Sequence, residues 1–322
     1  MSLPAVRPDL AELGARAADF ARASRSENTR RAYRSDWSDF EAWCTAAGLA
    51  ALPTAPTTLG AYLTDRAGRL KAATLSRRVA AITSAHRLKG FGFDASHPAI
   101  AGVLSGIRRV YGTRQDAKQA LLTEDLRRMV RALPATPIGI RDRALLLVGF
   151  AAALRRSELV ALDRADLEIT SAGAVLVIRH SKTDQEGRGR EVGIPRSKRS
   201  GSTTCPVAAL EAWLDHMQKS ACPSNRPANG QTEPLFTGVH QHRLSDRAVA
   251  RIVKQAAARV GIDPTQVAGH SLRSGFATSA ARGGADLAWI MQQTGHKSAD
   301  VAQRYVQRGS LLQNPASKAV KL

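Results

Sequence analysis

Helical spacing of apolar residues dominates this chain of 322 residues, and one short region breaks the pattern. Two β-branched runs, GAVLVIRHSKTD and GREVGIP, flank the turn-forming residues EGRG, and the segment ALDRADLEIT precedes them. We predict a β-hairpin with Lys182 near its tip, joined by a third strand from the preceding segment. The predicted fold is therefore mainly α with a small antiparallel β-sheet, an α+β class.

The first third of the chain is expected to be all-helical. Tyr33, Trp37, Phe40 and Cys44 recur at helical spacing, which favours a core role for the aromatic rings over base stacking. Further apolar periods predict three more helices before residue 112. Residues 1–24 are expected to form a loosely held, partly helical arm.

A polar segment, GTRQDAKQAL at residues 112–121, lacks any apolar period and is predicted to be an interdomain linker. It separates a helical domain at 25–111 from a second domain at 122–308, and a polar tail follows at 309–322. Within the second domain, an unusually apolar helix is predicted from Asp142 to Leu154.

The chain is strongly basic, with a formal net charge of +20. Residues 1–112 hold 16 Lys and Arg against 9 Asp and Glu, so the surplus of positive charge extends over both predicted domains. A distributed basic surface attracts an extended polyanion, and nucleic acid is the commonest one.

Several classes of protein do not fit the sequence. Three scattered cysteines, Cys44, Cys205 and Cys222, form neither a disulfide framework nor a zinc motif. No apolar run is long enough to cross a membrane, and the first residues lack the apolar region of a signal peptide. We expect a cytoplasmic protein without a membrane partner.

The stretch from His270 to Tyr305 gathers reactive side chains. His270 and Arg273 lie three residues apart in a predicted helix, so they share one face. Gly295 is expected to end the next short helix, with His296 in the turn and Tyr305 on the helix that follows.

These residue types suit cleavage of a phosphodiester without a metal ion. Arg155 and Arg273 can neutralise the phosphate, because a guanidinium stays charged and grips two oxygens. A tyrosine is a nucleophile once its proton, which titrates near ~10, is removed. His270 can accept a proton, His296 can donate a hydrogen bond, and Lys182 can protonate the leaving oxygen.

Each of these elements alone is common in unrelated proteins, but their order is specific. In this order and spacing, the chain resembles the tyrosine recombinase, or phage integrase, family. The matching elements are LRRSEL at 154–159, Lys182 in a hairpin, HSLR at 270–273, Gly295-His296, and Tyr305 nine residues later. NTRRAYRSDWSDFEAWC resembles the core-binding domain of that family, and the resemblance covers residues 25–308.

The resemblance implies a two-domain DNA clamp and a role for each matching position. The implied catalytic residues are Arg155, Lys182, His270, Arg273, His296 and the nucleophile Tyr305, with Glu158 supporting Arg155. It implies a 3′-phosphotyrosyl intermediate, and no cofactor, metal ion or ATP.

Three positions depart from the family pattern. Arg156 stands beside Arg155 where a smaller or apolar residue is common, although the step to Ser-Glu-Leu favours Arg155 as the site residue. Ser274 replaces a second histidine. Lys198 is a rival for Lys182, but it falls beyond the second strand of the hairpin.

The implied partners are double-stranded DNA with a specific recombination site, a homotetramer on that DNA and an accessory directionality protein. The tail at 309–322 is a candidate for exchange between protomers. Two other functions stay open, a type IB topoisomerase and a non-catalytic DNA-binding protein. Charge and helical position make four arginines candidates for DNA contact: Arg77, Arg78, Arg247 and Arg251.

Overall fold

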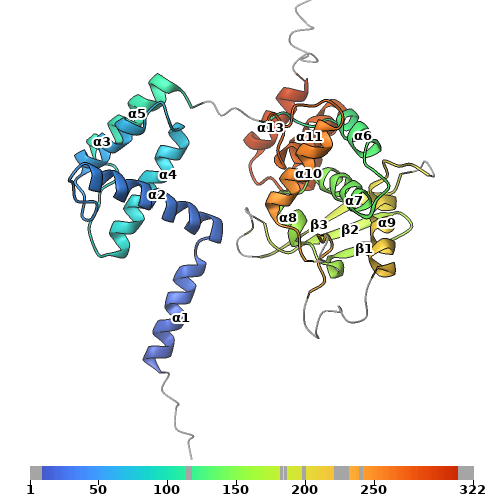
Figure 1. Cartoon of the computed structure of the whole chain (residues 1–322), viewed down its shortest axis with the longest axis horizontal. Helices are drawn as coiled ribbons and strands as arrows, with labels where there is room; N and C mark the ends of the chain where they lie inside the picture. The colour runs from blue at the N-terminus through green and yellow to red at the C-terminus, as the bar shows by residue number, and fades with distance from the viewer. Residues whose placement is uncertain are drawn as a thin grey trace, which may run out of the picture. The chain divides into compact units, whose positions relative to one another are not determined.

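The computed structural model describes residues 9–113, 118–181, 184, 187–197, 201–220, 232–238 and 242–310. The chain divides into two compact units, Met1–Asp116 and Ala117–Leu322, which Figure 1 shows with their elements labelled. The segment expected to be a linker spans this division. Lys182, Lys198, Cys222 and most of the tail lie outside the described residues.

The described part of the first unit is helical throughout. Its helices are α1 (Leu10–Ala23), α2 (Glu27–Ala46), α3 (Pro56–Arg66), α4 (Ala72–Leu88) and α5 (Pro98–Tyr111). Helix α2 packs on α4, and α3 packs on α5.

Aromatic rings form the centre of the core of the first unit. Phe40 and Tyr62 are fully buried and meet edge to face, with ring centroids 5.0 Å apart. Trp37 and Trp43 complete the cluster through similar edge contacts. The predicted core role is confirmed for Trp37 and Phe40, whereas Tyr33 is only half-buried and its ring lies beneath the Arg25 guanidinium.

The second unit combines a three-stranded antiparallel sheet, which lies at one side of it, with a larger group of helices (Figure 1). The strands are β1 (Leu167–Ile169), β2 (Gly173–Ile178) and β3 (Arg190–Pro195), paired in the order β1-β2-β3. The helices are α6 (Thr123–Arg131), α7 (Pro137–Ala151), α8 (Arg156–Ala161), α9 (Pro206–Lys219), α10 (Asp246–Ala258), α11 (His270–Arg282), α12 (Leu287–Thr294) and α13 (Ala299–Ser310). The predicted fold class, mainly α with a small antiparallel sheet, is confirmed.

Helix α7 is central to this unit, as its apolar sequence predicts. It packs on α9 and α11, and Leu145, Leu146 and Val148 are fully buried. The predicted start at Asp142 was wrong. The helix begins at Pro137, because the Thr136 side chain accepts a hydrogen bond from the Gly139 N–H and proline suits the first turn.

Ala153, two residues after the end of α7, adopts the left-handed conformation, with φ of 51°. The turn directs the chain into Leu154 and Arg155, and α8 begins at the next residue. A non-glycine residue in this conformation costs about 1–2 kcal/mol, so the surrounding packing must stabilise the turn. Its carbonyl faces the buried Arg273, which places the end of α7 beside α11.

Candidate active site

Arg273 lies at the centre of the candidate site. It is 1% exposed, and its Nη1 donates a hydrogen bond of 2.8 Å to the Ala153 carbonyl. Its Nε and Nη2 atoms are buried without a hydrogen-bond partner among the described residues. Burial, followed by the charge of Arg155, lowers the pKa of Arg273 to about 10, so it remains charged at neutral pH. A buried cation with unused donors is suited to binding an anion.

Arg155 is held by the first turn of α8. Its backbone N–H donates to Glu158 Oε2 at 2.9 Å, and its Nη1 donates to Oε1 at 2.5 Å. Glu158 is 2% exposed, so its carboxylate forms a fixed anchor. Arg156 is differently placed, because its aliphatic chain lies against Gly269, where a Cβ atom would be 2.0 Å from the Arg156 Cδ. This geometry favours Arg155 as the arginine of the site.

Tyr305 on α13 reaches across to α11. Its Oη lies 3.0 Å from Nε2 of His270, and the two helices pack against each other. A phenol has one proton to donate, so a neutral His270 accepts it through Nε2. Burial, followed by the charges of Arg273 and Arg155, lowers the pKa of His270, although part of the residue remains exposed. His270 is therefore neutral at physiological pH and able to take the tyrosine proton.

His296 stacks on the face of the Tyr305 ring. The two rings stack with centroids 5.8 Å apart and an interplanar angle of 17°. Nδ1 of His296 lies 2.8 Å from Oγ1 of Thr294, whose hydroxyl is 2.6 Å from the Ile290 carbonyl. Burial, followed by the charges of Arg273 and Arg155, lowers the pKa of His296 to about 4.

The structure thus brings together five of the six predicted catalytic residues: Arg155, His270, Arg273, His296 and Tyr305. The sixth, Lys182, lies outside the described residues. Sequence reasoning missed Thr294, which orients His296, and Arg190, which lies against Glu158. Neither carries a recognisable motif, because each acts through contacts made by the fold.

The predicted DNA contacts of the first unit are engaged with acids. Arg77 donates two hydrogen bonds, of 2.7 and 3.0 Å, to the buried carboxylate of Asp36. The Arg78 guanidinium contacts Asp39 and the Tyr62 hydroxyl, and its side chain is only 12% exposed. Arg77 therefore braces α4 against α2, Arg78 braces α4 against both α2 and α3, and of the two only Arg77 keeps substantial exposure.

On α10, Arg247 and Arg251 are exposed and lie one turn apart on the same face. Neither makes an ion pair with another described residue, so both remain candidates for phosphate contact. The described residues contain no group of three or more His, Cys, Asp or Glu side chains arranged to hold a metal ion. None of the helices in the described ranges is long and apolar enough to cross a membrane.

Two family models match this chain. The phage integrase family model matches residues 119–310, and that of the phage integrase N-terminal SAM-like domain matches residues 20–89. The chain therefore belongs to the phage integrase family of tyrosine recombinases, the enzymes of site-specific recombination, and the predicted family resemblance is confirmed.

Curated relatives agree with this assignment. An integrase/recombinase xerD homolog of Selenomonas ruminantium is 40% identical over 298 residues, covering 91% of this chain and 85% of the relative. Tyrosine recombinase XerC of Rhodospirillum centenum is 32% identical over 316 residues, covering 94% of this chain and 84% of the relative.

Solved structures share the fold at low sequence identity. The Tn1549 transposon integrase in complex with transposon right end DNA has a TM-score of 0.64 at 13% identity, covering 91% of this chain and 96% of that one. The XerH site-specific recombinase in a post-cleavage complex with difH substrate has a TM-score of 0.63 at 16% identity, covering 84% and 73%.

Proposed function

We propose that this protein cuts and rejoins double-stranded DNA at a specific recombination site through a covalent 3′-phosphotyrosyl intermediate on Tyr305. The observation that carries the proposal is the 3.0 Å contact between the Tyr305 hydroxyl and Nε2 of His270, beside the buried Arg273. DNA as the substrate is supported by the net charge of +20 and by the DNA complexes of the Tn1549 and XerH proteins.

Cleavage begins with the scissile phosphate bound between two arginines. The unpartnered donors of Arg273 and the guanidinium of Arg155 receive the non-bridging oxygens and offset the charge that builds up on them. Tyr305 Oη then attacks phosphorus while its proton passes to Nε2 of His270. The new bond joins Oη to phosphorus, and the bond from phosphorus to the 5′ oxygen breaks.

The departing 5′ oxygen needs a proton, and Lys182 is the proposed donor. Rejoining is the reverse, with the 5′-hydroxyl of a partner strand attacking the phosphotyrosine and Tyr305 recovering its proton. The covalent bond conserves the energy of the phosphodiester, so strand exchange proceeds without ATP or another cofactor. In this scheme, His296 contacts a phosphoryl oxygen.

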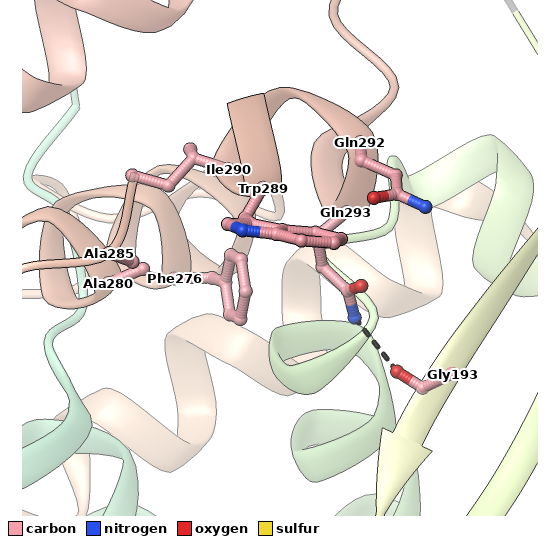
Figure 2. Close-up of a pocket in the computed structure, with 8 residues that line it drawn as sticks. All are labelled: Gly193, Phe276, Ala280, Ala285, Trp289, Ile290, Gln292 and Gln293. Carbon is pink, nitrogen blue, oxygen red and sulfur yellow. Dashed lines mark hydrogen bonds between the residues drawn. The ribbon is translucent and has the colours of Figure 1, made fainter. Parts of the chain in front are cut away.

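Strand exchange between two duplexes requires four active sites, and we propose a homotetramer in which residues 309–322 pass to a neighbour. An apolar hollow of about 310 Å³ on the second unit supports this exchange. Figure 2 shows Phe276 and Trp289 beside it, and Trp289 is 69% exposed. The tail contributes Leu311, Leu312 and Val320 as apolar anchors. The test is to delete residues 309–322 and measure tetramer assembly on DNA. Unchanged assembly would show that the tail is not exchanged between protomers.

The central experiment uses a nicked suicide duplex built from the site that the protein protects in footprints of DNA flanking its gene. Wild type is expected to form a covalent protein–DNA adduct, and Tyr305→Phe is expected to bind the same duplex without forming one. No adduct from wild type on its protected site would overturn the proposal in favour of a non-catalytic DNA-binding protein. Relaxation of supercoiled plasmids that lack the site would instead favour a type IB topoisomerase.

A further inference from the structure

Arg190 is the first residue of β3 and lies opposite Ile178 of β2. Its side chain is 20% exposed and points toward Glu158 of the candidate active site. The Nη2 atom forms an ion pair at 3.6 Å with Oε2 of Glu158, the carboxylate that holds Arg155. The two arginines thus share one buried anion.

The second terminal nitrogen of this guanidinium reaches the last turn of α12. Its Nη1 donates a hydrogen bond of 3.1 Å to the Gln293 carbonyl. Gln293 is itself tied to the sheet, because its side-chain amide donates to the Gly193 carbonyl at 3.1 Å, as Figure 2 shows. Two hydrogen bonds in opposite directions therefore join β3 to the end of α12.

Gly295 allows Arg190 to approach this closely. The glycine ends α12 in the left-handed conformation, with φ of 63°. A Cβ atom at this position would lie 2.8 Å from Nε of Arg190 and 3.2 Å from its Cζ. The guanidinium therefore packs directly on the backbone that leads into His296.

The guanidinium of Arg190 is not fully hydrogen-bonded, although its Nη2 atom keeps the 3.6 Å ion pair with Glu158. Its Nε and Nη2 atoms are buried without a hydrogen-bond partner among the described residues, as are the same two atoms of Arg273. Leaving a buried donor unpaired costs about 1–3 kcal/mol, so a residue whose role was only to brace the fold would be expected to pair them. The charge of Arg190 also acts on both Arg273 and His296.

We propose that Arg190 is a positioning residue of the cleavage site, linking Glu158, and so Arg155, to the turn that carries His296. This inference rests on the proposed function. It predicts that the phosphate-binding arginine and His296 hold their relative positions only while β3 keeps this arginine in place. A lysine would retain the charge but could not bridge Glu158 and Gln293 with a planar fork.

The test compares Arg190→Gln and Arg190→Lys with Arg196→Gln, a control in the residue that follows β3, whose guanidinium pairs with Glu211. Duplex affinity, single-turnover cleavage of the suicide duplex and thermal unfolding are measured for each. We expect Arg190→Gln to cut at least about tenfold more slowly per folded molecule, with affinity within about threefold of wild type. The cleavage rate of Arg190→Lys should fall between those of Arg190→Gln and wild type, and the rate of Arg196→Gln should match wild type.

A glycine pair covers the case in which Arg190→Gln fails to fold. Gly295 and Gly284 both have positive φ, but a Cβ atom at Gly284 meets nothing within 4 Å. Gly284→Ala therefore measures backbone strain alone, and Gly295→Ala adds a clash with the guanidinium. The inference predicts slower cleavage per folded molecule for Gly295→Ala than for Gly284→Ala, and equal rates for the two would overturn it.

Two results distinguish failure of the inference from failure of the proposed function. If wild type forms the Tyr305 adduct and Arg190→Gln cuts as fast per folded molecule, only the inference is wrong. If wild type forms no adduct, the function fails, and the link is tested without DNA by NMR titration of His296. Loss of the Arg190 charge should then raise the His296 titration midpoint relative to Arg196→Gln, and an unchanged midpoint would overturn the link.

Discussion

Two histidines contact Tyr305, and their hydrogen bonds determine which ring nitrogen of each can accept a proton. Nε2 of His270 faces the tyrosine hydroxyl directly. Nδ1 of His296 faces Thr294, whose own hydroxyl proton is directed to the Ile290 carbonyl. Nδ1 of His296 therefore carries the ring proton, and Nε2 of the neutral ring is an acceptor. To donate to a phosphoryl oxygen, His296 must gain a second proton, which the arriving phosphate charge favours.

The pH dependence of cleavage follows from His270. Burial and the charges of Arg273 and Arg155 lower its pKa below the ordinary histidine value of 6.5. The base is active when neutral, so the apparent second-order cleavage rate should rise with pH through an inflection below 6.5 and level off above it. Single-turnover rates at limiting DNA measure this profile. A rate still rising steeply above about pH 7.5 would contradict His270 as the base.

The stability of the second unit should depend on the protonation of His296. Folding lowers its pKa from 6.5 to about 4, so the unfolded chain binds more protons between these values. Stability is therefore lost as pH falls through that window, by on the order of 1–3 kcal/mol. Calorimetric unfolding should show a steeper acid decline for wild type than for His296→Gln. Parallel declines would mean that His296 remains accessible to protons in the folded state.

At the scale of elements, the position of α11 decides the site, because this helix carries both His270 and Arg273. The segment before α6 crosses α11 at Gly275, where a Cβ atom would lie 1.7 Å from the Leu121 carbonyl oxygen. The crossing is closed by a hydrogen bond of 3.1 Å from the Leu121 N–H to the Ser271 carbonyl. No side chain fits between these two backbones.

Gly275→Ala should therefore force α11 away from its neighbour. We expect a loss of at least about 1–3 kcal/mol of stability, with slower cleavage because His270 and Arg273 move together. Thermal unfolding and suicide-duplex cleavage measure the two effects. Gly106→Ala on α5 is the control, because a Cβ atom there meets nothing within 4 Å. A Gly275→Ala protein as stable as this control would show that the crossing can relax.

The sequence predicts elements well where local pattern decides them. The β-hairpin follows from two β-branched runs and a turn, and the spacing of His270 and Arg273 placed both on one helix face. The predicted start of α7, Asp142, lies five residues after the observed start at Pro137. The Thr136 cap and the tolerance of proline in a first turn explain the earlier start.

What the sequence could not predict depends on contacts between distant residues. Arg190 is one basic residue among 47, and its role appears only when the fold brings it to Gln293 and Gly295. Charge alone likewise made Arg78 a candidate for DNA contact. Its acidic partners, Asp36 and Asp39, lie 42 and 39 positions earlier in the sequence. They contact the Arg78 guanidinium only in the folded protein, so the sequence alone does not show that this side chain is engaged.

At the scale of the whole molecule, positive charge in both units predicts how binding responds to salt. Each phosphate contact releases condensed counterions, so affinity for duplex DNA should fall by about 10³-fold or more between about 50 and about 200 mM salt. Arg251→Gln should reduce the slope of log affinity against log salt by about one. Filter binding across a salt series measures both, and a slope unchanged by the substitution would remove Arg251 from the interface.

The central claim is that Tyr305 becomes covalently joined to DNA, and mapping the attachment residue tests it most directly. The chain contains four tyrosines, and the other three, Tyr33, Tyr62 and Tyr111, lie within the first 111 residues. Adduct trapped on the suicide duplex is digested with nuclease and protease, and the peptide that retains a nucleotide is sequenced by mass spectrometry. We predict the nucleotide on Tyr305, and attachment to any other residue would contradict the account.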